Sequence, residues 1–257
     1  MSRGSGAASA LDALSDVARV LSKDGPVSDF LNRYPWEKRF GLSDSLFLVG
    51  TDPIGACEAA AEFFFNLAFY NSTVDWAVLM RGALAFGEVQ YAAPLFPETA
   101  GANLAGEAVV EAVTLEKTGG KGPRLFVSGA VADLIMQNTG SGGISWILDR
   151  CSENLCELLW LLPPNPTRIN GGMVGQVADA VVRLFKRYGG DSQFSAHYVA
   201  YLDFVVRSLL CLREQNLNEV KAVLRQMDLE RIELCGKHLM GVPGVPVILE
   251  RLKSLCE

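Results

Sequence analysis

Strand-like and helix-like patterns alternate in the first half of this chain, whereas the second half is almost entirely helix-like. Apolar residues recur at helical spacing over 52–70 and 105–118, and apolar runs typical of covered strands lie at 42–50 and 124–128. Further helices are predicted at 7–22, 172–188, 194–214, 217–229 and 245–256. Such a division is typical of an α+β fold, in which helices pack on a sheet.

A Gly- and Ser-rich segment, "NTGSGG" at 138–143, separates these two halves of the chain. It predicts a domain of helices and strands over 1–138 and a helical extension packed on it over 139–257. Beyond the break lies "LCELLWLLPPNP", an apolar run of either helix or strand type that prolines stop. We interpret 75–89 as one long strand or two strands with a bend, and 90–104 as a loop.

The helix over 52–70 has clear local signals. Asp52 followed by Pro53 predicts its start, because aspartate caps free amide groups and proline suits the first helical turn. The apolar stripe of this helix includes Phe63, Phe64 and Leu67. We expect these three side chains to pack on the sheet.

Charge and hydropathy exclude several functional classes. The 257-residue chain has a formal net charge of −6, whereas a nucleic-acid surface needs clustered lysine and arginine. No apolar run reaches the length of about 18 residues that spans a bilayer, and the first residues lack the apolar core of a secretory signal. We therefore expect a cytoplasmic protein with neither a nucleic-acid nor a membrane partner. The six scattered cysteines form no Cys-x-x-Cys pair, which favours reduced, buried thiols over a zinc site.

Three motifs in the first half occur in the order of a known family. "LSDSLFLVG", "MRGALAFGEV" and "GEAVVEAVTLEK…GPRLFVS" resemble the hairpin, strand and helix motifs of the class III nucleotide cyclase homology domain. The resemblance is closest to a divergent bacterial branch and covers about residues 40–128. It implies a ferredoxin-like, cyclase-type sandwich of helices on a mainly antiparallel sheet, and a head-to-tail homodimer in bacterial signalling.

The same resemblance assigns candidate site residues. Family members join a 3′-hydroxyl to the α-phosphate of a nucleoside triphosphate with Mg²⁺ or Mn²⁺ held by two aspartates. Asp44 matches the hairpin aspartate and is the candidate metal ligand, although an aspartate that caps a turn is an equal alternative. Phe40 and Asn103 fall near the base-reading positions, and Arg81 is a further candidate nucleotide contact. A solvated loop asparagine is the alternative for Asn103.

Other catalytic positions of the family are altered. Val110 stands where the family has an asparagine, and Thr114 where it has a phosphate-binding arginine. The first strand, which carries the other aspartate, has no counterpart. We consider three explanations: a true start upstream of Met1, an internal segment in that place, or a strand from a partner chain. The run "CELLWLLP" at 156–163 is the internal candidate.

These losses favour a degenerate cyclase-like protein, that is, a non-catalytic nucleotide-binding or regulatory module that forms a dimer. The alternative is an active metal-dependent cyclase that forms a 3′,5′-cyclic nucleotide from a pyrimidine triphosphate. A third hypothesis treats the helical part, 165–257, as a scaffold that docks a partner. In the dimer hypothesis Tyr91, Leu95 and Phe96 of the long loop form an interface, and the alternative is that the loop folds back on its own chain.

Overall fold

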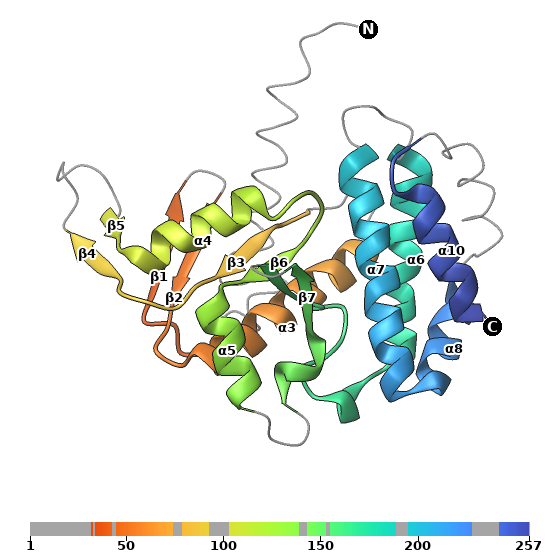
Figure 1. The fold of residues 1–257 in the computed structure, drawn as a ribbon, viewed down its shortest axis with the longest axis horizontal. Helices are drawn as coiled ribbons and strands as arrows, with labels where there is room; N and C mark the ends of the chain where they lie inside the picture. Colours follow the sequence, from red (N-terminus) through yellow and green to blue (C-terminus); the bar gives the residue numbers. More distant parts are fainter. Residues whose placement is uncertain are drawn as a thin grey trace, which may run out of the picture.

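The computed structural model shows an α+β protein, mostly helical (Figure 1). It describes residue 32 and residues 34–42, 45–73, 79–92, 103–138, 143–152, 155–188, 195–227 and 242–256. The predicted helix at 7–22 therefore lies outside the described residues. Within the described part, no helix is both long enough and apolar enough to cross a membrane.

The strands form three small sheets. They are β1 (Lys38–Leu42), β2 (Ser45–Val49), β3 (Gly82–Leu84), β4 (Gln90–Ala92), β5 (Asn103–Ala105), β6 (Leu125–Val127), β7 (Leu148–Ser152) and β8 (Leu155–Leu158). The main sheet has the order β3-β6-β8-β7; β3 and β6 are parallel, and the other neighbours are antiparallel. The strands β1 and β2 form an antiparallel pair, as do β4 and β5.

The helices follow the predicted periodicity closely. They are α3 (Pro53–Ser72), α4 (Glu107–Thr118), α5 (Gly129–Gln137), α6 (Gly171–Tyr188), α7 (Ser195–Gln215), α8 (Leu217–Gln226) and α10 (Val245–Cys256), with short 3-10 turns η1 (Ile144–Ile147) and η2 (Pro166–Arg168). The start of α3 is confirmed, because Asp52 Oδ1 accepts hydrogen bonds from the amides of Ile54 and Gly55 at 3.1 Å.

The main sheet contains strands from both sides of the domain boundary that the sequence predicts between residues 138 and 139. β8 lies between β6 and β7, so the apolar run at 156–163 enters the sheet as a strand at its beginning. An internal segment that follows the Gly- and Ser-rich break thus occupies a central place in the main sheet. Buried residues of both halves form one continuous core cluster.

Trp160 is the centre of this core. It is 1% exposed, its Nε1 donates to the carbonyl of Pro123 at 2.9 Å, and its ring stacks on Phe204 at 4.7 Å. Phe64 of α3 contacts the same indole at 5.7 Å between centroids. A Cβ on Gly82 would lie 3.1 Å from the Phe64 ring, which confirms that Phe64 of α3 packs on the sheet.

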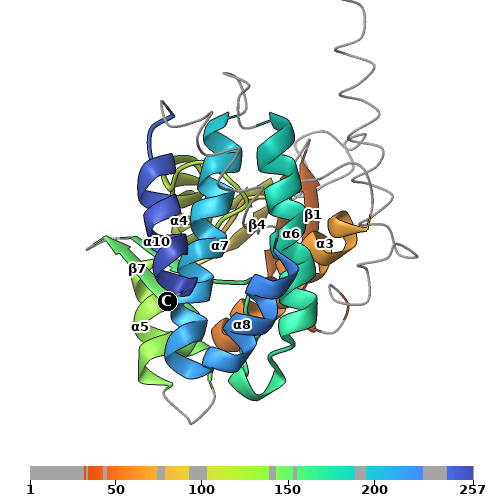
Figure 2. The ribbon, with the colours of Figure 1, turned by 90° about the vertical axis from the view of Figure 1, so that its right-hand side faces the viewer.

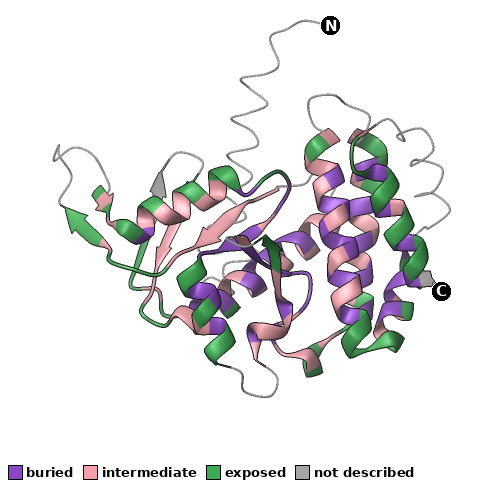
Figure 3. Ribbon diagram, in the orientation of Figure 1, coloured by how far each residue is buried: buried purple, intermediate pink, exposed green. Residues whose placement is uncertain are grey.

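The described residues that follow β8 include four helices, α6, α7, α8 and α10. α7 packs against α6, α8 and α10, and α6 also contacts α3 (Figure 2). Their buried residues face one another and their exposed residues face outward (Figure 3). These helices therefore form a helical layer that shares one core with the main sheet.

Several expectations needed correction. The segment 90–104 is not a simple loop, because its two ends pair as β4 and β5. The strand expected over 75–89 is described only as β3. The strands β1 and β7 and the helix α5 were not predicted, because their short segments lack a distinct periodic pattern.

Candidate functional site

Gly87 of the motif "MRGALAFGEV" and Gly106 of the motif "GEAVVEAVTLEK" lie where the start of α4 contacts the segment before β4. Gly106 has φ +126°, and a Cβ there would lie 2.3 Å from the carbonyl oxygen of Glu88. A Cβ on Gly87 would lie 3.5 Å from the backbone nitrogen of Ala108. The conformation and the close contact at Gly106 require glycine, so this residue positions the start of α4, whereas the distance at Gly87 is an ordinary van der Waals contact. Gly106 thus has a structural role that needs no bound phosphate.

Arg81 lies at the carboxyl end of α4. Its Nη2 is 2.6 Å from Glu116 Oε1, and its Nη1 donates to the carbonyl of Gly120 at 3.0 Å. A cation at this end of a helix is also favoured by the helix dipole. Arg81 therefore has protein partners for both terminal nitrogens, although about a quarter of its side chain is exposed.

The two residues that the motif resemblance aligns with family donors, Val110 and Thr114, are exposed on α4. Val110 is 67% exposed and presents only an apolar surface. The Thr114 hydroxyl donates to the Val110 carbonyl at 2.7 Å, so its hydrogen serves the helix backbone. Neither side chain provides the amide or guanidinium donors that the family has at these positions.

The other predicted site residues lie elsewhere. Asn103 is exposed at the start of β5, before the amino end of α4, so it and Arg81 are at opposite ends of that helix. Phe40 pairs with Phe47 in the separate β1–β2 sheet. Asp44 falls between these two strands in the sequence and lies outside the described residues. The structure thus does not bring Arg81 and Asn103 together.

His197 connects the segment after α4 to the first turn of α7. Its Nδ1 accepts a hydrogen bond from the Gly122 amide at 3.4 Å, which requires an unprotonated ring nitrogen. Burial lowers the pKa of His197, and the positive charges of Lys121 and Arg81 lower it further. The end of α4 is therefore a region of positive charge, with Glu116 as its acidic partner.

A second cluster of charged residues lies inside the molecule, between the main sheet and α7. Glu157 of β8 is fully buried, and its Oε1 accepts from Arg124 Nε at 2.8 Å. Its Oε2 accepts from Arg124 Nη2 at 2.5 Å and from Arg207 Nη2 at 2.6 Å. Arg207 also pairs with Asp149 and Asp203.

Opposite charges keep the two arginines ionised. Burial by itself lowers the pKa of Arg207, but the charge and hydrogen bonds of Glu157 outweigh it, and the pKa lies above its ordinary value. The pKa of Arg124 is raised in the same way, against the effect of burial. The cluster is thus a buried Arg–Glu–Arg network that joins the sheet to the helical layer.

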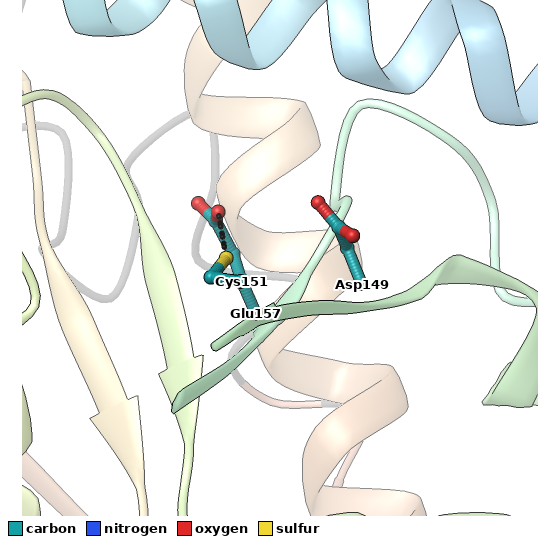
Figure 4. Close-up of side chains that lie close together, drawn as sticks. All are labelled: Asp149, Cys151 and Glu157. Atoms are coloured by element: carbon teal, nitrogen blue, oxygen red, sulfur yellow. Dashed lines mark hydrogen bonds between the residues drawn. The ribbon is translucent and has the colours of Figure 1, made fainter. Parts of the chain in front are cut away.

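The same place has three potential metal ligands (Figure 4). Ligand atoms of Asp149, Cys151 and Glu157 lie within 4.8 Å of one another. Cys151 is exposed, unlike the buried thiols that the sequence predicts, but partial desolvation raises its pKa to about 11 and the nearby Glu157 charge contributes, so the thiol is protonated at neutral pH. It donates to Glu157 Oε2 at 3.5 Å. A metal would have to displace two guanidinium groups and this proton, which favours a structural ion network.

Sequence reasoning missed this network. The available signal was one acidic residue, Glu157, inside the apolar run "CELLWLLP", because a charge buried among apolar residues needs a partner. The partners Arg124 and Arg207 are 33 and 50 residues away, and no local pattern connects them.

Comparison of the chain with protein-family models, with curated proteins and with solved structures found no match. Function is therefore argued from the residues and geometry of the site and from the motif resemblance.

Proposed function

We propose that this protein is a degenerate nucleotide-cyclase-like module with a ferredoxin-like, cyclase-type sandwich, acting as a non-catalytic nucleotide-binding or regulatory dimer in bacterial signalling. The three motifs and their order support the family. The proposed loss of catalysis rests mainly on the side chains on the exposed side of α4. There, Val110 is exposed and the Thr114 hydroxyl bonds to the backbone, and the motif resemblance aligns these two residues with catalytic donors of the family.

The missing donors have a large kinetic consequence. Loss of one hydrogen-bond donor to a developing charge typically reduces kcat by about 10²–10³-fold. Two lost donors and one unmatched aspartate would together leave negligible cyclase activity. Binding is less demanding, because one metal ligand at Asp44 and a base contact at Asn103 or Phe40 can hold a metal–triphosphate complex without turning it over.

The contacts that Arg81 makes within the protein also favour the loss of catalysis. Its ion pair with Glu116 and its bond to Gly120 fix it at the far end of α4 from Asn103. The charge of an arginine held in this way is offset by Glu116, and its position away from Asn103 does not suit it to stabilise a reacting group beside that residue.

The test measures turnover and binding separately. The protein is incubated with Mn²⁺ and each of ATP, GTP, CTP and UTP, and cyclic products are measured by chromatography. We expect no product, but a higher Tm with at least one triphosphate and Mn²⁺. Asp44→Asn should remove this increase, whereas the control Asp133→Asn, on an exposed position of α5, should retain it. A cyclic product would establish the active-cyclase alternative, and an unchanged wild-type Tm with all four triphosphates would refute nucleotide binding.

A further inference from the structure

A small pocket lies where α3, the segment 162–170 and α6 meet. Its volume is about 170 Å³. Engineered cavities of about 150 Å³ with apolar walls hold benzene, whereas pockets for drug-sized ligands measure about 300 Å³ or more. The pocket therefore suits a molecule with a single ring.

The exposure of the lining residues distinguishes the inner part of the pocket from its mouth. Ala61, Leu162 and Val174 line it and are each 1% exposed, so the inner part is apolar. Arg168 and Asn170 also line it and are exposed, so they lie at the mouth. A matching ligand has an apolar body and one polar group that stays at the mouth.

Three lining residues favour an aromatic body over an aliphatic one. Phe65 and Met173 are partly exposed, so their side chains have surface that a ligand can cover. Aromatic rings attract one another in offset or edge-to-face arrangements, and a methionine sulfur makes favourable contacts with a ring. The Arg168 guanidinium at the mouth is a further group that attracts the face of an aromatic ring.

The charges near the mouth do not select an ionic ligand. Burial raises the pKa of Glu58 in α3, and Glu62 raises it further, whereas the positive charge of Arg168 lowers it. Arg168 therefore lies in the field of carboxylates of α3, one of which, Glu62, also lines the pocket. Because both signs of charge occur together, an uncharged polar group suits this mouth better than an anion or a cation.

Two asparagines of the lining provide uncharged hydrogen-bonding groups. Asn170 Oδ1 accepts from the Met173 amide at 3.2 Å, which fixes the side-chain orientation, and its NH₂ group has no protein partner among the described residues. Asn66 Nδ2 donates to the Glu62 carbonyl at 2.7 Å, and within the described part of the chain its Oδ1 likewise has none. A hydroxyl group both accepts and donates, so it can bond to either amide.

We propose that this pocket binds a phenol, that is, a small uncharged aromatic molecule with one hydroxyl group. The ring lies against Phe65 and Met173, and the hydroxyl oxygen accepts a hydrogen bond from Asn170 at the mouth. The ligand contacts both α3, which packs on the sheet, and α6 of the helical layer, so its binding stabilises the folded protein. The proposal does not depend on the cyclase-like function.

The first experiment follows the methionine methyl signals by NMR while phenol is added up to about 10 mM, because so small a ligand binds weakly. The Met173 signal is assigned with Met173→Leu. We expect a saturable shift of this signal with phenol. Toluene, which lacks the hydroxyl, should bind about 3–10-fold more weakly, and the charged analogues benzoate and benzylammonium should also bind more weakly than phenol.

A variant of Asn170 tests the polar contact by calorimetry. Asn170→Asp keeps the oxygen that accepts from the Met173 amide but removes the NH₂ donor, so it should weaken phenol binding by about 3–10-fold. The matched control is Asn165→Asp. Asn165 Oδ1 accepts from the Thr167 amide at 2.9 Å in the same way, but this residue does not line the pocket, so the control should bind as the wild type does.

A second variant tests the location. Met173→Trp fills the pocket and should abolish binding, whereas Met136→Trp, at a position of α5 that is 52% exposed, should not change it. Tm measured without ligand checks that each variant folds. The absence of a saturable Met173 shift with phenol would overturn the proposal. Equal binding of phenol and either charged analogue would also overturn it, as would wild-type affinity in Asn170→Asp or in Met173→Trp.

Discussion

At the scale of single residues, the most consequential side chain of this protein is the carboxylate of Glu157. It is fully buried in the main sheet and bonded to Arg124 and Arg207, whose side chains are 16% and 15% exposed. A charge in such a place is stable only with partners, because desolvation of an ion costs several kcal/mol. The three side chains therefore depend on one another, and they link β6, β8 and α7.

Glu157→Gln should consequently lower the free energy of unfolding by about 3–5 kcal/mol, because it leaves two largely buried guanidinium groups without their shared carboxylate. Urea denaturation followed by circular dichroism measures this loss. The control is Asp179→Asn, which removes the partner of Arg183 in a more exposed pair four residues apart on α6. That change should cost less than about 1 kcal/mol. Equal losses in the two variants would contradict the importance of the buried network.

At the scale of elements, α4 is held at both ends by backbone contacts. Its start depends on Gly106 against Glu88, and the segment after it contacts α7 through Gly122, which has φ +89°. A Cβ on Gly122 would lie 3.1 Å from the Ala200 Cβ, so glycine is needed for α7 to approach. The bond from the Gly122 amide to His197 completes this connection.

This connection should weaken in mild acid. The pKa of His197 is lowered below its ordinary value of 6.5 in the folded protein, first by burial and then by Lys121 and Arg81. The unfolded chain therefore takes up a proton first as the pH falls below 6.5. The stability that His197 contributes is fully present above that pH and is lost as the pH falls through the folded-state pKa.

The measurement is a titration of the His197 ring by NMR, together with Tm against pH for the wild type and His197→Gln. We expect a ring pKa below 6.5 and a smaller decrease in Tm on acidification for the variant. A pKa at or above that value would show that the surrounding charges do not act on this ring.

At the scale of the whole molecule, three exposed apolar side chains lie on segments that meet near the amino end of α4. Phe86, Tyr91 and Val110 are 54%, 41% and 67% exposed. They come from neighbouring segments, since Gly87 meets Ala108 and β4 pairs with β5. Leu95 and Phe96, the other residues of the expected interface, lie outside the described residues. Exposed apolar groups near one another are typical of association surfaces.

The proposed dimer should therefore use this surface. Light scattering at micromolar concentration should give twice the chain mass of 27.8 kDa for the wild type. The double variant Phe86→Asp, Val110→Asp should shift the protein to monomer, because each buried side chain of this size contributes about 1.5–3 kcal/mol. Val247→Asp, at an equally exposed position of α10, is the matched control and should stay dimeric. A wild-type mass of 27.8 kDa would refute the dimer.

The sequence by itself determined the elements whose signals are local. The helices α3, α6, α7, α8 and α10 begin and end close to their predicted bounds, because apolar periodicity, an Asp-Pro start and Gly or Pro breaks act within a few residues. It also determined the apolar face of α3, with Phe64 on the sheet.

Only the tertiary structure decided the sheet order and the charged network. The run at 156–163 was ambiguous by pattern, and its pairing with β6 and β7 follows from contacts between residues far apart in the sequence. Glu157 finds Arg124 and Arg207 only after this pairing brings β6 and β8 together under α7. Such features depend on which elements become neighbours, and local sequence patterns do not determine which elements pack together.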